Sequence, residues 1–256
     1  MRFRNLGSGS SGNATLVEAT GIVPLRVLVD CGLGIRQLLH RLGEAGLQAQ
    51  DIHAVFITHE HGDHIGCARA LALRYRIPVW MSQGTHSAIG APDFDGLLHR
   101  ARDGKAIDLG GLQLTPFTVP HDAREPLQLS CTDGAAKLGI LTDLGHASRH
   151  VLDQLAGCNA LLLESNHDEV MLSHSKYPAF LKARVGGDFG HLSNMQAAEI
   201  LSAVMHDKLR HVSAAHLSLQ NNHPSLAQSA LAVVMGCMPA EIVAACPEIG
   251  TPWLTV

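Results

Sequence analysis

Four residues of the kinds that bind metal ions, His59, His61, Asp63 and His64, fall within six consecutive positions. They come directly after the apolar run 54–58, which is typical of a buried strand, so they lie in the loop that leaves it. His59 and His61 can point to one side of an extended segment, and an intervening glycine lets the chain turn sharply afterwards. Imidazole and carboxylate groups hold zinc, manganese or iron. A charged surface loop is the alternative, and it would suit a lone histidine better than this set.

Four ligands cannot complete a site for two metal ions, so further ligands must come from elsewhere in the chain. His121, Asp143 and His216 share the same setting, a polar residue at or just after the end of an apolar run. Each of them alone could be an ordinary residue at the end of a strand. Because the pattern repeats, we interpret all three as candidate metal ligands.

The ordered set of these residues resembles the five-motif signature of the metallo-β-lactamase superfamily, over nearly the whole chain. The resemblance implies an α/β fold, an αββα sandwich of two mixed β-sheets flanked by helices, with the metals at one sheet edge. It also implies two divalent metal ions, zinc or manganese, with iron possible. The implied ligands of the first ion are His59, His61 and His121. Those of the second are Asp63, His64 and His216, with Asp143 bridging the two ions.

Four further segments resemble a narrower group, the small WalJ/YycJ-type branch of bacterial proteins regarded as 5′→3′ DNA exonucleases. They are Gly-Ser-Ser-Gly-Asn at 9–13, Glu-Ser-Asn-His-Asp at 164–168, Gly-His-Leu-Ser-Asn at 190–194, and the stretch 216–222. Larger nucleic-acid-processing relatives carry a second domain as a long insertion between the positions of Asp143 and His216. Such an insertion is missing here, so we expect no clamping of the substrate by a second domain.

The elements that must position these residues follow from hydrophobic periodicity and turn residues. Strands are expected at 26–30, 54–58, 78–81, 112–119, 127–132, 137–142, 160–164 and 211–215. Helices are expected at 35–42, 67–75, 148–155, 193–205 and 224–235. A turn at Asp133-Gly134 predicts a hairpin. Strands early and helix–strand alternation later favour two sheets face to face with helices outside, in a single domain spanning 1–256.

The composition bounds the class of protein. The chain has 256 residues, 46% hydrophobic residues and a net charge of −4, and it holds 17 histidines beside few aromatic residues. This excludes a disordered chain, and no apolar run approaches the roughly 18 residues of a membrane span. The six cysteines form no CxxC pair, which is typical of free thiols in a cytosolic protein. With no apolar signal segment near the start, we expect a cytoplasmic protein without a membrane partner.

The mechanism expected from these residues is hydrolysis by a metal-activated water. Two close divalent ions lower the pKa of a shared water from ~15.7 toward neutrality. Asp63 is the best candidate to orient that water, although a metal-bound carboxylate is a weak base. His191 and His167 are candidates for the acid that protonates the leaving oxygen. Alternatively, His191 is a loop residue beside a helix cap, and His167 closes its loop by hydrogen bonds.

Two segments could hold a phosphate. Ser10, Ser11 and Asn13 form a short polar turn that offers N–H and hydroxyl groups, and an ordinary hairpin turn is the alternative. Ser193 and Asn194 open the helix 193–205, where free backbone N–H groups bind anions, and a simple N-cap at Ser193 is the alternative.

Three functions remain open from the sequence. The first is a metal-dependent phosphodiesterase that acts on DNA ends, although the net negative charge counts against a nucleic-acid partner. The second is a small-molecule hydrolase of the same fold that cleaves a thioester, lactone or β-lactam. The third is a non-catalytic metal-binding regulator, against which the complete ligand set argues. The sequence implies no obligate protein partner.

Overall fold

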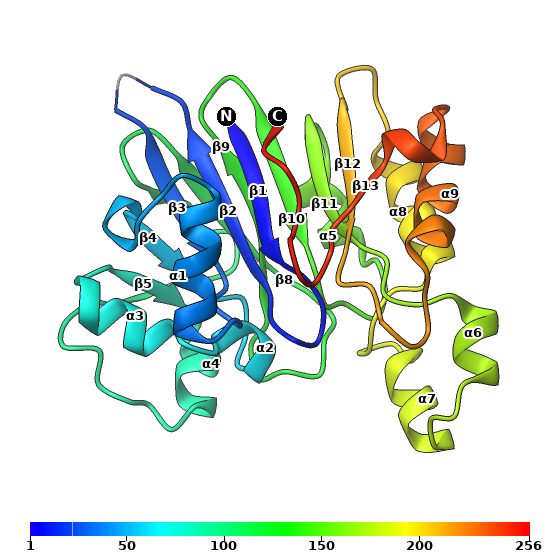
Figure 1. Ribbon diagram of the computed structural model, residues 1–256, viewed down its shortest axis with the longest axis horizontal. Coiled ribbons are helices and arrows are strands. Elements are labelled where there is room, and N and C mark those ends of the chain that lie inside the picture. The colour runs from blue at the N-terminus through cyan, green and yellow to red at the C-terminus, as the bar shows by residue number, and fades with distance from the viewer. Residues whose placement is uncertain (22) are drawn as a thin grey trace.

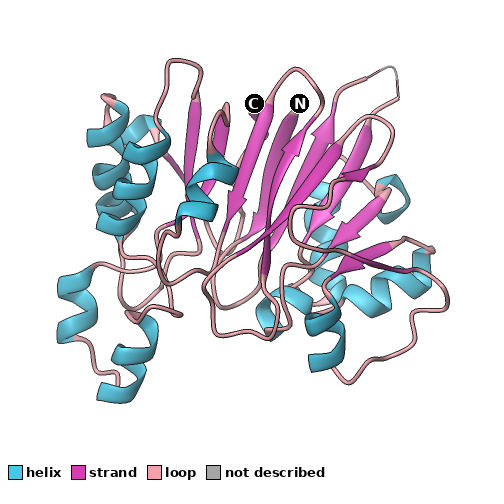
Figure 2. Ribbon diagram, turned by 180° about the vertical axis from the view of Figure 1, so that it is seen from behind, coloured by secondary structure: helices cyan, strands magenta, loops and turns pink. Residues whose placement is uncertain are grey.

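Two β-sheets pack face to face in the computed structural model, which describes residues 1–21 and 23–256. Within these residues each sheet has seven strands, and helices lie on the outer face of each sheet (Figures 1 and 2). Both sheets combine parallel and antiparallel pairs. The expected αββα sandwich is therefore confirmed.

The first sheet has the order β14-β1-β2-β3-β4-β5-β6. Its strands are β1 (Arg2–Gly7), β2 (Ala14–Ala19), β3 (Leu25–Val29), β4 (Ala54–Phe56), β5 (Val79–Met81), β6 (Leu98–Arg100) and β14 (Leu254–Thr255). The pairs from β14 to β3 are antiparallel, and those from β3 to β6 are parallel. The two ends of the chain thus pair with each other at one side of this sheet (Figure 1).

The second sheet has the order β13-β12-β11-β10-β9-β8-β7. Its strands are β7 (Ile107–Asp108), β8 (Gln113–Thr118), β9 (Leu127–Thr132), β10 (Lys137–Leu141), β11 (Ala160–Glu164), β12 (His211–Ala215) and β13 (Val243–Ala244). The strands from β7 to β10 form an antiparallel meander, and those from β10 to β13 are parallel. Thr132 pairs with Lys137 across the predicted Asp133-Gly134 turn, which confirms the hairpin.

Helices cover the outer faces of the sheets. On the first sheet lie α1 (Ile35–Glu44), α2 (Gly62–Ile65), α3 (Ala68–Tyr75) and α4 (Gln83–Ala88). On the second lie α5 (Arg149–Leu155), α8 (Asn194–Val204) and α9 (Pro224–Met235), and two 3-10 turns occur at Ala49–Asp51 and Pro239–Glu241. The helices α6 (Glu169–His174) and α7 (Ala179–Val185) project beyond the sandwich (Figure 1, lower right).

Apolar side chains form three layers, because successive residues of each strand point to opposite faces of its sheet. Val17 and Val27 point into the core between the sheets, whereas Leu16 and Leu28 point into the layer under the first helices. A third cluster packs the second sheet against α5, α8 and α9. Successive side chains of a strand point to opposite faces, so a sheet covered on both sides is apolar at nearly every position.

The polar start of the chain forms an internal strand, which the sequence did not predict. Asn5 is buried in β1, and its backbone N–H donates to Oγ1 of Thr251 at 3.0 Å. Its side-chain Nδ2 donates to Oγ1 of Thr15 at 3.1 Å. The side-chain Nδ2 thus has a partner, whereas Oδ1 of Asn5 is buried and has none among the described residues. A polar residue in such a strand interrupts the hydrophobic periodicity, so the strand gives no clear signal in the sequence.

No helix among the described residues is long and apolar enough to span a membrane.

Candidate metal centre

The strand directions explain why residues far apart in sequence meet. β8 is antiparallel to β9, which is antiparallel to β10, so β8 points the same way as the parallel strands β10, β11 and β12. The carboxyl ends of these four strands therefore lie at one edge of the second sheet. His121, Asp143 and His216 follow three of those ends, and the loop after β4 supplies the other candidates from the first sheet.

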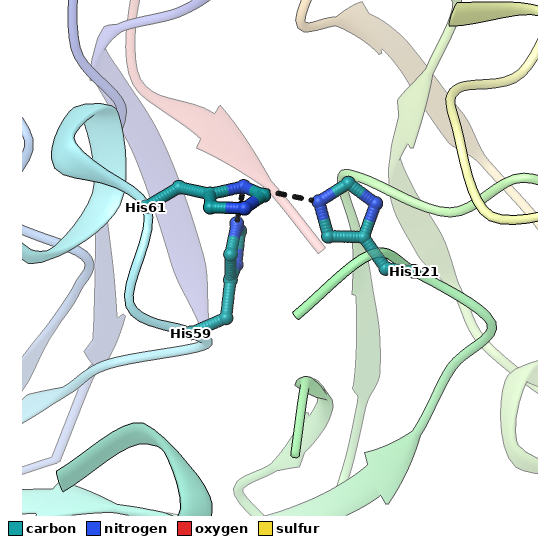
Figure 3. A group of neighbouring side chains, drawn as sticks. All are labelled: His59, His61 and His121. Atoms are coloured by element: carbon teal, nitrogen blue, oxygen red, sulfur yellow. Dashed lines mark hydrogen bonds between the residues drawn. The ribbon is translucent and has the colours of Figure 1, made fainter. Parts of the chain in front are cut away.

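Three imidazole rings converge first. Nε2 of His59 lies 3.0 Å from Nδ1 of His61, and Nε2 of His121 lies 3.3 Å from the same Nδ1. Figure 3 shows the three rings pointing toward one another from two loops. Their ligand atoms all lie within 4.8 Å of one another. This trio matches the set that the resemblance implied for the first ion.

A second trio consists of Asp63, His64 and His216, again with ligand atoms within 4.8 Å of one another. Oδ2 of Asp63 lies 3.6 Å from Nε2 of His64 and 3.4 Å from Nε2 of His216. Asp143 stands between the two trios, because its Oδ2 lies 2.5 Å from Nε2 of His64 and it groups with His59 as well.

The donor set fits metal ions. Oδ2 of Asp143 is buried and, among the described residues, makes no hydrogen bond of good geometry in spite of its short contact with His64. Burial lowers the pKa of His59 and of His121, which favours the neutral imidazole that binds metals. Nitrogen and carboxylate lone pairs that face each other at such distances are stabilised by a cation between them.

The backbone is strained at the ends of three strands. Asp30, Asp143 and His216 have φ angles of 63°, 58° and 55°, the left-handed region that residues with a side chain rarely adopt. Asp30 and His216 directly follow β3 and β12, and Asp143 follows β10 after one intervening residue. Such strain persists only where the surrounding structure holds it, and it collects at functional sites. The turn is what directs these polar side chains across the sheet edge.

Asp30 supports the cluster from behind, and the sequence reasoning missed this role. Its Oδ2 lies 2.8 Å from Nδ1 of His64, and its Oδ1 accepts the backbone N–H of Thr58 at 2.8 Å. A carboxylate on the far nitrogen of a ligand histidine fixes the ring and its tautomer. Asp30 follows an apolar strand, as the candidate ligands do, but this position alone does not distinguish it from other carboxylates at strand ends.

Glu164 is a second buried carboxylate, to which the sequence analysis gave a place at the end of a strand and in the segment 164–168 but no role at the site. Its Oε1 lies 2.8 Å from Nδ1 of His191 and 3.0 Å from Nδ1 of His216, and its Oε2 accepts the backbone N–H groups of Leu144 and Leu192. Burial alone would raise the pKa of Glu164, but the charge and hydrogen bonds of His191 and His216 outweigh it and lower the pKa to about 2. Glu164 is therefore an anion that holds both rings.

His191 lies beside the cluster, as the sequence suggested. Its Nδ1 is 3.1 Å from Oδ1 of Asp143, and its side chain is 23% exposed, so part of the ring is accessible to solvent. Burial lowers the pKa of His191, but the charge of Glu164 and hydrogen bonds to both carboxylates prevail and raise it to about 9.

His167 does not join the cluster. It is buried beside the amino end of α8, and its Nδ1 has no hydrogen-bond partner among the described residues. The backbone carbonyl of His167 accepts the N–H of Asn194 at 2.8 Å. The backbone of His167 thus closes its loop, and the role of its side chain as an acid stays a prediction.

Ser193 and Asn194 have structural partners. Ser193 caps α8 by accepting from the N–H of Gln196, and its hydroxyl donates to Glu169 at 2.9 Å. Asn194 forms a reciprocal amide pair with Asn222, at 2.9 Å in both directions. Neither side chain is free to receive a phosphate, so the N-cap alternative describes Ser193.

The turn at 9–13 divides into two parts. Nδ2 of Asn13 is 3.3 Å from Oδ2 of Asp63, and the N–H of Asn13 donates to the carbonyl of Asp63 at 2.7 Å, so Asn13 orients a candidate ligand. A side chain at Gly32 would clash with that same carbonyl. Ser10 and Ser11 are exposed and line a 140 Å³ pocket that also includes Leu217, the neighbour of His216.

The fold and this cluster define a metal-binding hydrolase, and the comparisons agree. A family model described as the Beta-lactamase superfamily domain matches residues 25–212, so the chain belongs to this family. It is 34% identical to Exodeoxyribonuclease YycJ of Bacillus anthracis over 240 residues, which cover 92% of this chain and 89% of the relative.

Two further similarities extend over most of the chain. Exodeoxyribonuclease WalJ of Streptococcus pneumoniae is 31% identical over 231 residues, covering 88% of this chain and 85% of the relative. The crystal structure of the metallo-β-lactamase fold protein YhfI from Bacillus subtilis superposes with a TM-score of 0.75 at 15% identity, covering 99% of both chains. The homologues and the superfamily establish a metal-dependent hydrolase, whose His/Asp groups are able to bind metal ions.

Proposed function

We propose that the protein is a phosphodiesterase with two divalent metal ions that removes nucleotides from DNA ends in the 5′→3′ direction. One observation carries the proposal: two ligand trios, each compact enough for one ion, meet at Asp143. The names of the relatives, both exodeoxyribonucleases, support DNA as the substrate. The direction rests on the resemblance of the side motifs to the WalJ/YycJ-type branch.

Each residue of the centre has a proposed role. One ion would be held by His59, His61 and His121. The other ion would be held by Asp63, His64 and His216, and Asp143 would contact both ions. Divalent ions in such a site acidify water and neutralise charge on phosphoryl oxygens; zinc and manganese suit these ligands, and iron also fits. Asp63, which Asn13 orients, would direct the attacking water.

His191 and two serines complete the proposal. His191 would donate a proton to the leaving oxygen, because its ring is held by Glu164 beside Asp143 and is partly accessible. Ser10 and Ser11 would contact a phosphate, because their exposed turn lies next to the loop that carries His216. We place the reaction in the cytoplasm, on the basis of the free cysteines.

The decisive experiment compares labelled DNA ends. Purified protein is stripped with EDTA and reloaded with Zn²⁺ or Mn²⁺, and then incubated with duplex and single-stranded DNA labelled at the 5′ or the 3′ end. The proposal predicts metal-dependent release of a labelled mononucleotide from the 5′ end at the earliest times. Elemental analysis of the reloaded protein should give two ions per chain.

Three other outcomes would contradict this function in whole or in part. Release of the 3′ label first would overturn the direction but keep the nuclease. Turnover of a thioester, lactone or β-lactam without cleavage of any phosphodiester would favour the small-molecule hydrolase instead. Full activity in EDTA, with no ion bound, would exclude the metal centre.

A further inference from the structure

We propose that the lobe formed by α6 and α7, residues 168–190, is a platform on which unpaired bases of the DNA strand stack beside the metal centre. The inference rests on the proposed function, since the platform serves a nucleic-acid strand that leads to the metals. The lobe projects from the edge of the sandwich next to α8 (Figure 1). It lies between Asp143 and His216, where the sequence carries no long insertion.

Two aromatic side chains of the lobe are exposed to solvent. Phe180 and Phe189 are 75% and 60% exposed, and they are the only exposed phenylalanine, tyrosine or tryptophan residues in the described chain. The remaining phenylalanines are all buried in the cores. None of the residues of α7 is buried, so this helix contributes nothing to a core. Aromatic rings left in water on this helix and on the loop that follows it indicate a binding surface.

Phe189 is adjacent to the metal centre. It lines a 350 Å³ pocket together with Asp122 and Gly190. The carbonyl of Gly190 lies 3.1 Å from Nδ1 of His121, and Oδ1 of Asp122 lies 3.5 Å from Nε2 of the same ring. A base stacked on Phe189 would therefore be next to the candidate ligands.

Phe180 extends this surface away from the metals. It is four residues before Arg184 on α7, so the two side chains share one face of the helix. Nε of Arg184 lies 2.6 Å from Oδ2 of Asp122, which ties this face to the loop that carries His121. The order Phe180, Arg184, Phe189 thus runs along the lobe toward the metal centre.

The charge of the segment suits a phosphate backbone. Residues 176–189 contain Lys176, Lys182 and Arg184 but only one carboxylate, Asp188, in a chain of net charge −4. Arg184 is paired with Asp122, so Lys176 and Lys182 supply the cationic charge of this stretch. Asp168, which caps α6, and Glu169, which accepts from the hydroxyl of Ser193, keep their charge at the start of the lobe. Cations interleaved with aromatic rings are typical of surfaces that bind single strands without reading their sequence. An apolar protein partner would not require the cations.

The test measures kcat and KM on two substrates for the metal-loaded protein. One is a 5′-phosphorylated single-stranded 20-mer, and the other is bis(p-nitrophenyl) phosphate, which has no bases. Phe180→Ala and Phe189→Ala should each raise KM for the oligonucleotide about tenfold, within the range of losses for one stacked base. The double variant should lose more, and all should hydrolyse the small ester at the wild-type rate. Val233→Ala, at an 82% exposed position of α9, should change neither value.

Two variants separate stacking from plain apolar contact. Phe180→Leu keeps the apolar bulk but removes the ring, so it should behave like Phe180→Ala. Phe180→Trp should keep the wild-type KM, and its fluorescence should be quenched when the oligonucleotide is added. Restoration of KM by leucine, or a tryptophan that DNA does not quench, would overturn the platform.

The two proposals fail in different ways. If the wild-type protein degrades DNA and the double variant does so with an unchanged KM, the platform is wrong and the nuclease stands. If the wild-type protein cleaves no DNA, the proposed function is wrong and the platform falls with it. Circular dichroism and unchanged turnover of the small ester show that each variant is folded.

Discussion

Asp30 and Asp143 hold the same ring from its two sides: Oδ2 of Asp30 is 2.8 Å from Nδ1 of His64, and Oδ2 of Asp143 is 2.5 Å from Nε2. The first contact leaves Nε2 as the nitrogen that faces the site. Asp30→Asn keeps the size and tolerates the positive φ, but it removes the charge that holds the ring. We expect metal affinity to fall by about 10- to 100-fold.

Competition with a chelator of known affinity measures this change. Asp153→Asn, at an exposed carboxylate on α5, is the control and should bind metal like the wild type. Unchanged affinity in Asp30→Asn would mean that His64 needs no support from behind.

Asp63→Ala should reduce turnover of DNA by several orders of magnitude while the protein stays folded. Asp63 is proposed both to hold an ion and to direct the water, so one substitution removes two roles. Single-turnover rates, metal content and thermal unfolding of the same preparation check the result. Turnover near the wild-type rate with unchanged metal content would contradict both roles.

His191→Ala separates proton donation from positioning. If His191 protonates the leaving oxygen, kcat on DNA should fall by roughly 10²–10⁴-fold with little change in metal content. Bis(p-nitrophenyl) phosphate has a leaving group that needs no acid, so its hydrolysis should hardly change. An equal loss on both substrates would show that His191 positions its neighbours and donates no proton.

Through Glu18, the stability of the protein should depend on pH in a way that does not involve the metals. It is buried in β2, with its carboxylate oxygens 2.5 Å from Nε of Arg2 and 2.6 Å from Nε of Arg26. Burial alone would raise the pKa of Glu18, but the two arginines outweigh it and lower the pKa. A lowered pKa means stability that is present at neutral pH and is lost as the pH falls through the folded-state value.

Glu18→Gln should therefore lower the free energy of unfolding at pH 7 by about 1–3 kcal/mol. The gap to the wild type should begin to shrink below about pH 4.5, where the carboxyl of the unfolded chain takes up a proton, and should close as the pH falls through the lower folded-state pKa of Glu18. Urea unfolding at several pH values measures both effects. Glu44→Gln removes an exposed ion pair with Arg41 and should cost less than about 0.5 kcal/mol. A gap that stays constant down to pH 3 would contradict the ion-pair account.

The sequence predicted the sandwich and the positions of the candidate ligands because both depend on strong local patterns. Apolar runs marked the strands, and polar residues at their ends marked His121 and Asp143. The same rule did not single out Asp30 or Glu164, because carboxylates at strand ends are common and only the sheet order shows which ends meet. The lobe was missed for another reason: a helix with no buried face leaves no hydrophobic period to detect.

The candidate ligands come from both sheets, four from the loop after β4 and three from the ends of strands in the second sheet. Neither sheet alone offers a complete site, so tight metal uptake requires that the two halves of the chain have already docked. Bound metal would thus slow the separation of the two sheets while leaving the formation of each one unaffected. Protein that captures metal during refolding would therefore report correct assembly of the sandwich, and misassembled chains would remain in the metal-free fraction.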